Sequence, residues 1–281
     1  MISRNKLQLS AILIIIISIS KPLLSDFKDV QKLIAEMIAQ TKTVQSITYT
    51  TETKERINGE IIKRGGIFKM IVSPPKVYYE RHFPEKGAIV IYDSLKLGRK
   101  IQVKPHTFPW VPLTLSMDDW LIRKSGHHTP DRAGFGYTVD ILVSLLEKYN
   151  ENLGTILRLG EMKIYDEKMC QVVHLENPYF QWQSYTVKEN ESIITIAKER
   201  KLSEYMIFER NKGLKNYEYL ETGKIIRIPT DYAAAMDIWI DLKSKLPVKF
   251  TVYDDRGLFE EFGYKKIQIN IPLTDNDFKL P

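Results

Sequence analysis

The chain has 281 residues, 43% of them hydrophobic and 11% aromatic, with only 14 glycines, which excludes a disordered chain or a fibrous repeat. Its single cysteine, Cys170, excludes a disulfide framework and any site built from clustered thiolates. The formal net charge is +6, but Arg4, Lys6 and Lys21 lie in a segment without acidic residues. The remaining charge is dispersed, so we expect no nucleic-acid partner, and the length predicts two folding units.

The first 25 residues have the pattern of an export signal. The short basic segment Met1–Lys6 precedes the apolar stretch Leu7–Ser20, and Ser25 offers a small residue for cleavage before Asp26. An uncleaved membrane anchor is the alternative, although the apolar stretch is shorter than the ~20 residues that normally span a bilayer. We therefore expect an exported protein of the periplasm or cell envelope.

The region after this segment predicts a helix followed by a meander of strands. Apolar residues at three- and four-residue steps predict an amphipathic helix over residues 27–40, with the stripe Val30, Leu33, Ile34, Met37 and Ile38. The expected strands cover residues 46–57, 61–72, 77–82, 88–92 and 100–103. Asn58-Gly59 between the first two strands is a hairpin signal. Short strands with regular turns predict an antiparallel sheet that curls.

The second half of the chain returns to the same elements after a proline-rich loop. Residues 105–130 show no regular period, and a helix is expected over residues 137–149 with Val139, Leu142, Leu145 and Leu146 as its stripe. Further strands are expected at residues 162–165, 171–175, 237–241, 248–253 and 263–269.

Residues 185–229 contain a complete small unit between two of these strands. Its two ends predict strands, and the apolar spacing between them predicts two short helices. The unit resembles a LysM domain, the βααβ module that binds N-acetylglucosamine in peptidoglycan or chitin. The resemblance rests on Tyr185, Val187, Glu191, Ser192, Ile193, Ile196, Ala197, Asn211, Leu220, Gly223, Ile226, Ile228 and Pro229.

The resemblance implies a sugar groove between the first strand–helix turn and the last helix–strand loop. The implied glycan-binding residues are Asn190, Glu191, Ser192, Ile193, Lys212, Gly213, Leu214, Lys215 and Tyr217. Asn190 stands where the family commonly has glycine, although asparagine tolerates a positive φ, and the basic loop from Lys212 to Tyr219 is longer than usual. Glu191 and Ser192 also suit helix capping. A degenerate module that acts only as a spacer is the alternative.

The flanking sequence resembles the LolA-like lipoprotein carriers. The segments Asp241–Lys249, Tyr253–Leu258 and Ile269–Asp275 resemble the carboxyl half of that group, and residues 127–137 resemble an uncharacterised exported LolA-like family. This implies an α+β fold, an antiparallel half-barrel wrapped around helices, with a hollow that accepts acyl chains. The implied domains are a signal peptide at 1–25, a half-barrel made of 26–183 and 232–281, and the LysM domain at 185–229.

The proline-rich loop supplies candidates for a lipid pocket. They are Phe108, Trp110, Leu113, Leu115 and Trp120. Burying ~12 methylenes would contribute on the order of 10 kcal/mol before ordering costs, so an acyl chain is a suitable ligand. The alternative is that these side chains fill the barrel as core.

No set of residues predicts catalysis. Cys170 and His174 share one face of an expected strand, but a buried strand cysteine is the preferred interpretation because no helix terminus activates the thiol. His127 and His128 lack the partners of a metal-binding motif. We therefore expect no catalytic residue, no metal and no cofactor. The expected partners are peptidoglycan or another N-acetylglucosamine polymer, together with a lipid or lipoprotein acyl chain. An envelope polymer hydrolase and a structural wall protein with a filled barrel remain as alternatives.

Overall fold

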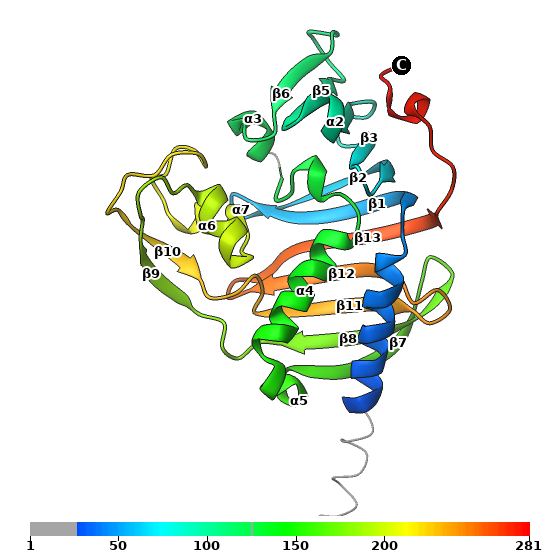
Figure 1. Ribbon diagram of the computed structural model, residues 1–281, viewed down its shortest axis with the longest axis vertical. Coiled ribbons are helices and arrows are strands. Elements are labelled where there is room, and N and C mark those ends of the chain that lie inside the picture. The colour runs from blue at the N-terminus through cyan, green and yellow to red at the C-terminus, as the bar shows by residue number, and fades with distance from the viewer. Residues whose placement is uncertain (1–26, 125) are drawn as a thin grey trace, which may run out of the picture.

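The computed structural model describes residues 27–124 and 126–281 (Figure 1). The predicted signal segment, residues 1–25, lies outside the described residues. No helix in the described part of the chain combines the length and the hydropathy that a bilayer span requires.

An open antiparallel sheet of eleven strands forms the body of the protein. Its spatial order is β6-β5-β4-β3-β2-β1-β13-β12-β11-β8-β7, so the first and last long strands of the chain are neighbours. The strands are β1 (Ser46–Ile57), β2 (Glu60–Ile71), β3 (Lys76–Phe83), β4 (Ile89–Asp93), β5 (Lys100–Lys104), β6 (Leu113–Ser116), β7 (Leu157–Tyr165), β8 (Lys168–Glu176), β11 (Ala235–Asp241), β12 (Pro247–Asp254) and β13 (Gly257–Ile269).

The hairpin between β1 and β2 sets the register of the long strands. Asn58 and Gly59 both have positive φ, 52° and 85°, which matches the tight turns whose twist suits antiparallel strands. The two strands pair along their full length, from Ser46 opposite Ile71 to Ile57 opposite Glu60.

Two amphipathic helices cover one face of the sheet, and both apolar stripes are confirmed. The first helix spans residues 27–42 and α4 spans Gly136–Lys148. Both lie across the part of the sheet from β13 to β8 (Figure 1). They share one core with that part of the sheet, and its members include Val30, Ile34, Met37, Val139, Leu142, Leu145, Val173, Ile238 and Phe250.

Short elements complete the half-barrel. They are α2 (Ser94–Leu97), α3 (Trp120–Arg123), α5 (Leu153–Ile156) and the 3-10 turns η1 (Pro130–Arg132), η2 (Asn150–Asn152) and η3 (Asp275–Phe278). The proline-rich segment predicted as a loop therefore contains strand β6 and helix α3. Four-residue elements between prolines are too short to give a periodic pattern.

The inserted unit leaves and re-enters the sheet between two neighbouring strands. Strands β8 and β11 pair directly, with Glu176 opposite Ala235, and the residues between them contain β9 (Trp182–Thr186), α6 (Ile193–Arg200), α7 (Glu204–Arg210) and β10 (Ile225–Pro229). Strands β9 and β10 pair only with each other, in a separate two-stranded sheet. The predicted fold class, an α+β half-barrel with an inserted βααβ unit, is confirmed.

Candidate functional site

The first turn of the inserted unit is fixed by side-chain hydrogen bonds at the start of α6. Ser192 Oγ accepts a hydrogen bond from the Thr195 N–H at 3.1 Å, and Thr195 Oγ1 accepts one from the Ser192 N–H at 2.8 Å. Glu191 accepts hydrogen bonds from the Tyr185 hydroxyl at 2.6 Å and the Lys188 N–H at 2.8 Å. Burial opposes ionisation of Glu191, but these two bonds hold its pKa below the usual value.

The second loop lies beside this turn, as the LysM resemblance implies. The Ile193 N–H donates to the Tyr217 carbonyl oxygen at 3.1 Å. Asn190 has a φ of 61°, a conformation that asparagine adopts more readily than most residues. Of the nine glycan-binding residues predicted from the sequence, the exposed ones are Asn190, Lys212, Gly213 and Lys215. Glu191 and Leu214 are half-buried, and Ser192, Ile193 and Tyr217 are buried.

The side chain of Tyr217 points into the molecule. Its ring stacks on Phe208 with centroids 4.5 Å apart and lies 6.2 Å from the ring of Trp120 in the half-barrel. Its hydroxyl is buried without a hydrogen-bond partner among the described residues, and burial raises its pKa. Tyr217 therefore contributes its backbone carbonyl to the turn, while its ring packs between Phe208 of the inserted unit and helix α3.

Helix α7 anchors the inserted unit to the end of the sheet (Figure 1). Glu204, only 1% exposed, accepts hydrogen bonds from both Nη atoms of Arg132 and lies 3.5 Å from Arg123 Nη1. The next residue, Tyr205, accepts a hydrogen bond from the Asn58 N–H at 2.7 Å through its hydroxyl oxygen. The unit is therefore bound to the half-barrel by buried contacts.

A second ion-pair cluster joins the same two parts. Arg56 of β1 binds both carboxylate oxygens of Asp254 and lies 3.6 Å from Glu209 of α7. Arg256, in the turn between β12 and β13, also binds Glu209. Neither cluster is visible in the sequence pattern, because the partners lie more than 40 positions apart.

The two histidines of residues 127–128 belong to a buried network around Glu260. Glu260 is fully buried, and its Oε2 lies 2.8 Å from His127 Nδ1 and 3.0 Å from His128 Nε2. The Tyr232 hydroxyl donates to Glu260 Oε1 at 2.7 Å. His127 Nε2 lies 3.0 Å from the Arg56 carbonyl oxygen, so both ring nitrogens of His127 face acceptors.

Charge on this network follows from its geometry. Burial opposes protonation of His127, but the hydrogen bond to Glu260 and the charge of Glu55 raise its pKa above the usual value. The same histidines hold the pKa of Glu260 well below its usual range despite its burial. The two acceptors therefore favour the imidazolium form of His127, and its ring is stacked between Tyr205 of the inserted unit and Phe259 of β13, with centroids 4.5 and 4.1 Å away.

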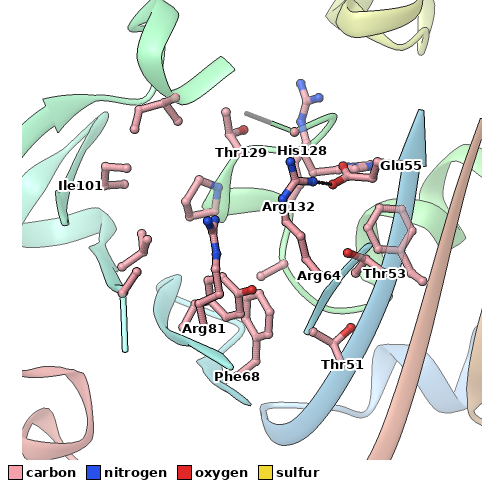
Figure 2. A pocket seen from close by; sticks show the side chains of 18 of the residues that line it. Thr51, Thr53, Glu55, Arg64, Phe68, Arg81, Ile101, His128, Thr129 and Arg132 are labelled. Atoms are coloured by element: carbon pink, nitrogen blue, oxygen red, sulfur yellow. Dashed lines mark hydrogen bonds and ion pairs between the residues drawn. The ribbon is translucent and has the colours of Figure 1, made fainter. Parts of the chain in front are cut away.

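A cavity of about 440 Å³ lies on the part of the sheet that the two long helices leave uncovered. Its wall is formed by one face of β13 and of β1 to β5, and residues 105–107, Gly126, 128–130 and 132–134 border it. Figure 2 shows the side chains that face it, with Thr51, Thr53 and Glu55 on β1 and Ile101 on the opposite side. Gly66 lets β2 and β3 approach closely behind this wall, since a Cβ there would come 2.2 Å from the Glu80 carbonyl oxygen and 2.5 Å from the Tyr79 ring.

The cavity wall consists of three adjacent rows of cross-strand neighbours. The first row is apolar and joins Tyr49, Phe68, Tyr79, Val90 and Val103 through successive strand pairs. Its three aromatic rings are stacked, with centroids 5.0 Å apart for the first pair and 4.3 Å for the second. The second row joins Thr51, Gly66 and Arg81, and a third row places Thr53 opposite Arg64. Neighbouring rows are two residues, or about 7 Å, apart along each strand.

The five pocket candidates named from the sequence lie outside this cavity. Phe108 and Trp110 are 81% and 67% exposed, and Leu113 and Trp120 are also exposed. Leu115 is half-buried against a small core cluster that includes Ile101 and Met117. These residues do not fill the interior of the half-barrel as core either. The proline-rich segment borders the cavity at residues 105–107 and then continues outward to the edge strand β6.

The sequence signal for the cavity wall was the alternation of side chains along β1, which places every second residue on one face. Tyr49, Thr51, Thr53 and Glu55 are two residues apart, so they share one face of the strand. The sequence alone does not say that this face borders a cavity, because the answer depends on where the covering helices end.

The residues considered for catalysis occupy structural positions. Cys170 is fully buried, and burial raises its pKa to about 11, so the thiolate is disfavoured at neutral pH. His174 Nδ1 lies 2.6 Å from Asp237 Oδ1. Within residues 27–124 and 126–281, no group of three or more histidine, cysteine, aspartate or glutamate side chains is arranged to hold a metal ion.

Comparison with protein families identifies one region. The LysM domain model matches residues 185–229, which confirms the LysM prediction for the inserted unit. A search of curated proteins finds no match.

Comparison with solved structures finds weak similarity over most of the chain. The Mycobacterium tuberculosis lipoprotein LppX is 12% identical, with 87% of this chain and 98% of LppX covered and a TM-score of 0.42. LprF from Mycobacterium bovis is 9% identical, with 88% and 95% covered and a TM-score of 0.43. A LolA superfamily protein from Nitrosomonas europaea is 12% identical, with 89% and 97% covered and a TM-score of 0.32.

Proposed function

We propose that this protein is an exported, non-enzymatic binding protein of the cell envelope. In this proposal the LysM domain attaches it to peptidoglycan or another N-acetylglucosamine polymer, and the half-barrel holds the acyl chain of a lipid or lipoprotein. The observation that carries the proposal is the combination in one chain of a LysM domain and a separate cavity with an apolar wall. Apolar cavities of this size with a few polar groups are the usual form of small-ligand sites.

The glycan site is proposed at the two adjacent turns of the LysM domain. An N-acetyl group presents one carbonyl oxygen, one N–H and a methyl group, which backbone groups of two neighbouring turns can satisfy together. The side chains free to assist are the exposed Asn190, Lys212 and Lys215. Ser192 and Tyr217 serve the fold of the turns through their buried side chains.

Reversing the charge of the exposed loop tests the glycan site. The double variant Lys212→Glu with Lys215→Glu is expected to weaken sedimentation with purified peptidoglycan sacculi by about tenfold, since two donors beside the turns are lost. The matched control is Lys198→Glu with Lys224→Glu, which makes the same charge change at exposed positions of the same domain. Equal loss in both variants would indicate general charge attraction and would contradict the proposed groove.

Filling the cavity tests the lipid site. Thr53→Trp places a large ring in the cavity and is expected to reduce co-purifying lipid, measured by mass spectrometry, by about tenfold. Thr48→Trp makes the same substitution on the opposite face of β1 and should retain wild-type lipid, because alternate residues face opposite sides. Absence of lipid from the wild-type protein after delivery of mixed envelope lipids would contradict this half of the proposal.

A further inference from the structure

The cavity contains cationic groups next to its apolar row. Arg64 on β2 and Arg81 on β3 both border it, and their side chains are 14% and 19% exposed. Figure 2 shows both arginines among the aromatic and aliphatic side chains of the wall. Arginine in such a place normally has partners for its N–H groups, because a buried donor without an acceptor costs about 1–3 kcal/mol.

The acidic partners of these arginines leave donors unused. Glu55 accepts a hydrogen bond from Arg64 Nη1 at 2.5 Å, and its other oxygen accepts the His127 N–H at 2.7 Å. Arg81 Nη1 binds Glu85, whose side chain is 47% exposed. Arg81 Nε is buried and has no hydrogen-bond partner among the described residues. Arg81, whose side chain borders the cavity, therefore has an unsatisfied guanidinium donor.

The position of these arginines suits a particular kind of ligand. Arg81 lies two residues from Tyr79 along β3, so the row of Arg81 and the apolar row are about 7 Å apart, and Arg64 lies one row further along β2. A molecule that lies across both rows must have an anionic oxygen at one end and an apolar chain at the other. A volume of about 440 Å³ lies near the lower end of the ~300–1,000 Å³ typical of ligand pockets, which favours one chain over several.

We infer that the cavity selects a single-chain amphiphile whose head group carries an anionic oxygen, a carboxylate or a phosphate, bound at Arg81 and Arg64. This inference rests on the proposed lipid-binding function and specifies its ligand class. The head group accepts hydrogen bonds from the guanidinium groups of Arg81 and Arg64 that border the cavity, and the chain lies along the row from Phe68 to Val103. Charge-assisted hydrogen bonds of this kind are about twice as strong as neutral ones.

Titration calorimetry on the full chain, freed of co-purified lipid, tests the inference with three amphiphiles of equal chain length. Myristate carries a carboxylate, 1-myristoyl-lysophosphatidylglycerol carries a phosphate, and 1-monomyristoylglycerol is neutral. At least one anionic amphiphile is expected to bind about tenfold more tightly than the neutral one. The anionic amphiphile that binds more tightly identifies the head group as a carboxylate or a phosphate.

Substitution of one arginine locates the selectivity. Arg81→Gln is expected to reduce the anionic preference to less than about threefold without changing the Kd of the neutral amphiphile. Arg99→Gln is the matched control, because Arg99 binds Asp118 on the surface and does not border the cavity. The comparison of the three amphiphiles uses the wild-type protein, so it remains valid even if a variant fails to fold.

The outcomes separate the inference from the function on which it rests. Equal binding of neutral and anionic amphiphiles by the wild-type protein would overturn the inference and leave the lipid-binding proposal intact. An anionic preference that survives in a folded Arg81→Gln variant would also overturn it. Failure of all three amphiphiles to bind would remove the lipid-binding proposal itself.

Discussion

Glu260→Gln is expected to lower the free energy of unfolding by about 3–5 kcal/mol, because it leaves a buried imidazolium without its counter-charge. Glu260 is fully buried and interacts with His127, His128 and Tyr232. Glutamine keeps the shape of the side chain, so the loss reports charge and hydrogen bonding. Urea unfolding at neutral pH, followed by circular dichroism, measures the change.

A surface carboxylate provides the control for this prediction. Glu52 lies on β1 and forms an ion pair with Lys265 at 2.9 Å, with its side chain 56% exposed. Glu52→Gln is expected to cost less than about 1 kcal/mol, as exposed ion pairs usually do. A similar loss for the two variants would show that His127 carries no buried charge.

Glu204→Gln is expected to have an effect of comparable size at the contact between the LysM domain and the half-barrel. Glu204 is the buried partner of Arg132, so its replacement leaves this guanidinium without its counter-charge, at a cost of about 3–5 kcal/mol, whereas Arg123 keeps Asp118. The variant should also loosen the domain contact. Limited proteolysis is then expected to cut the connecting segments near residues 177–181 and 230–234 faster than in the wild type.

A carboxylate elsewhere in the LysM domain is the control for this effect. Glu199 is exposed on α6, and Glu199→Gln should leave both the urea midpoint and the proteolysis rate unchanged. Unchanged proteolysis in Glu204→Gln, together with a lowered stability, would contradict the anchoring role and indicate a purely local effect.

The elements of the fold were predictable where one local pattern decides the structure. The alternation of residues 46–57, the Asn58-Gly59 turn and the apolar stripe of the first helix each depend on neighbouring residues only, and each is present in the structure. The LysM unit was recognisable because its residues occur at fixed spacings. By contrast, β6 has only four residues directly after Pro112, and its existence depends on pairing with β5.

The interior of the candidate sites was less predictable, because distant partners decide which way a side chain points. Large apolar residues such as Phe108 and Trp110 suggested a pocket, yet the cavity wall comes from alternate residues of β1 and β2. The paired histidines showed no partner in the sequence, because the residue that binds both of them, Glu260, lies more than 130 positions away. Tyr217 likewise faces Phe208 and Trp120 and not solvent, an orientation set by the half-barrel.

The placement of the LysM unit has a consequence for how such a chain gains or loses a module. Because Glu176 and Ala235 face each other across adjacent strands, excision of residues 177–234 needs only a short hairpin to reconnect them. The sheet would keep its connectivity, but Arg123 and Arg132 would lose Glu204, and Arg56 would lose Glu209. Removal of the module without loss of stability therefore requires compensating changes at these arginines. The two parts must evolve together, although the backbone connects the module to the sheet only between β8 and β11.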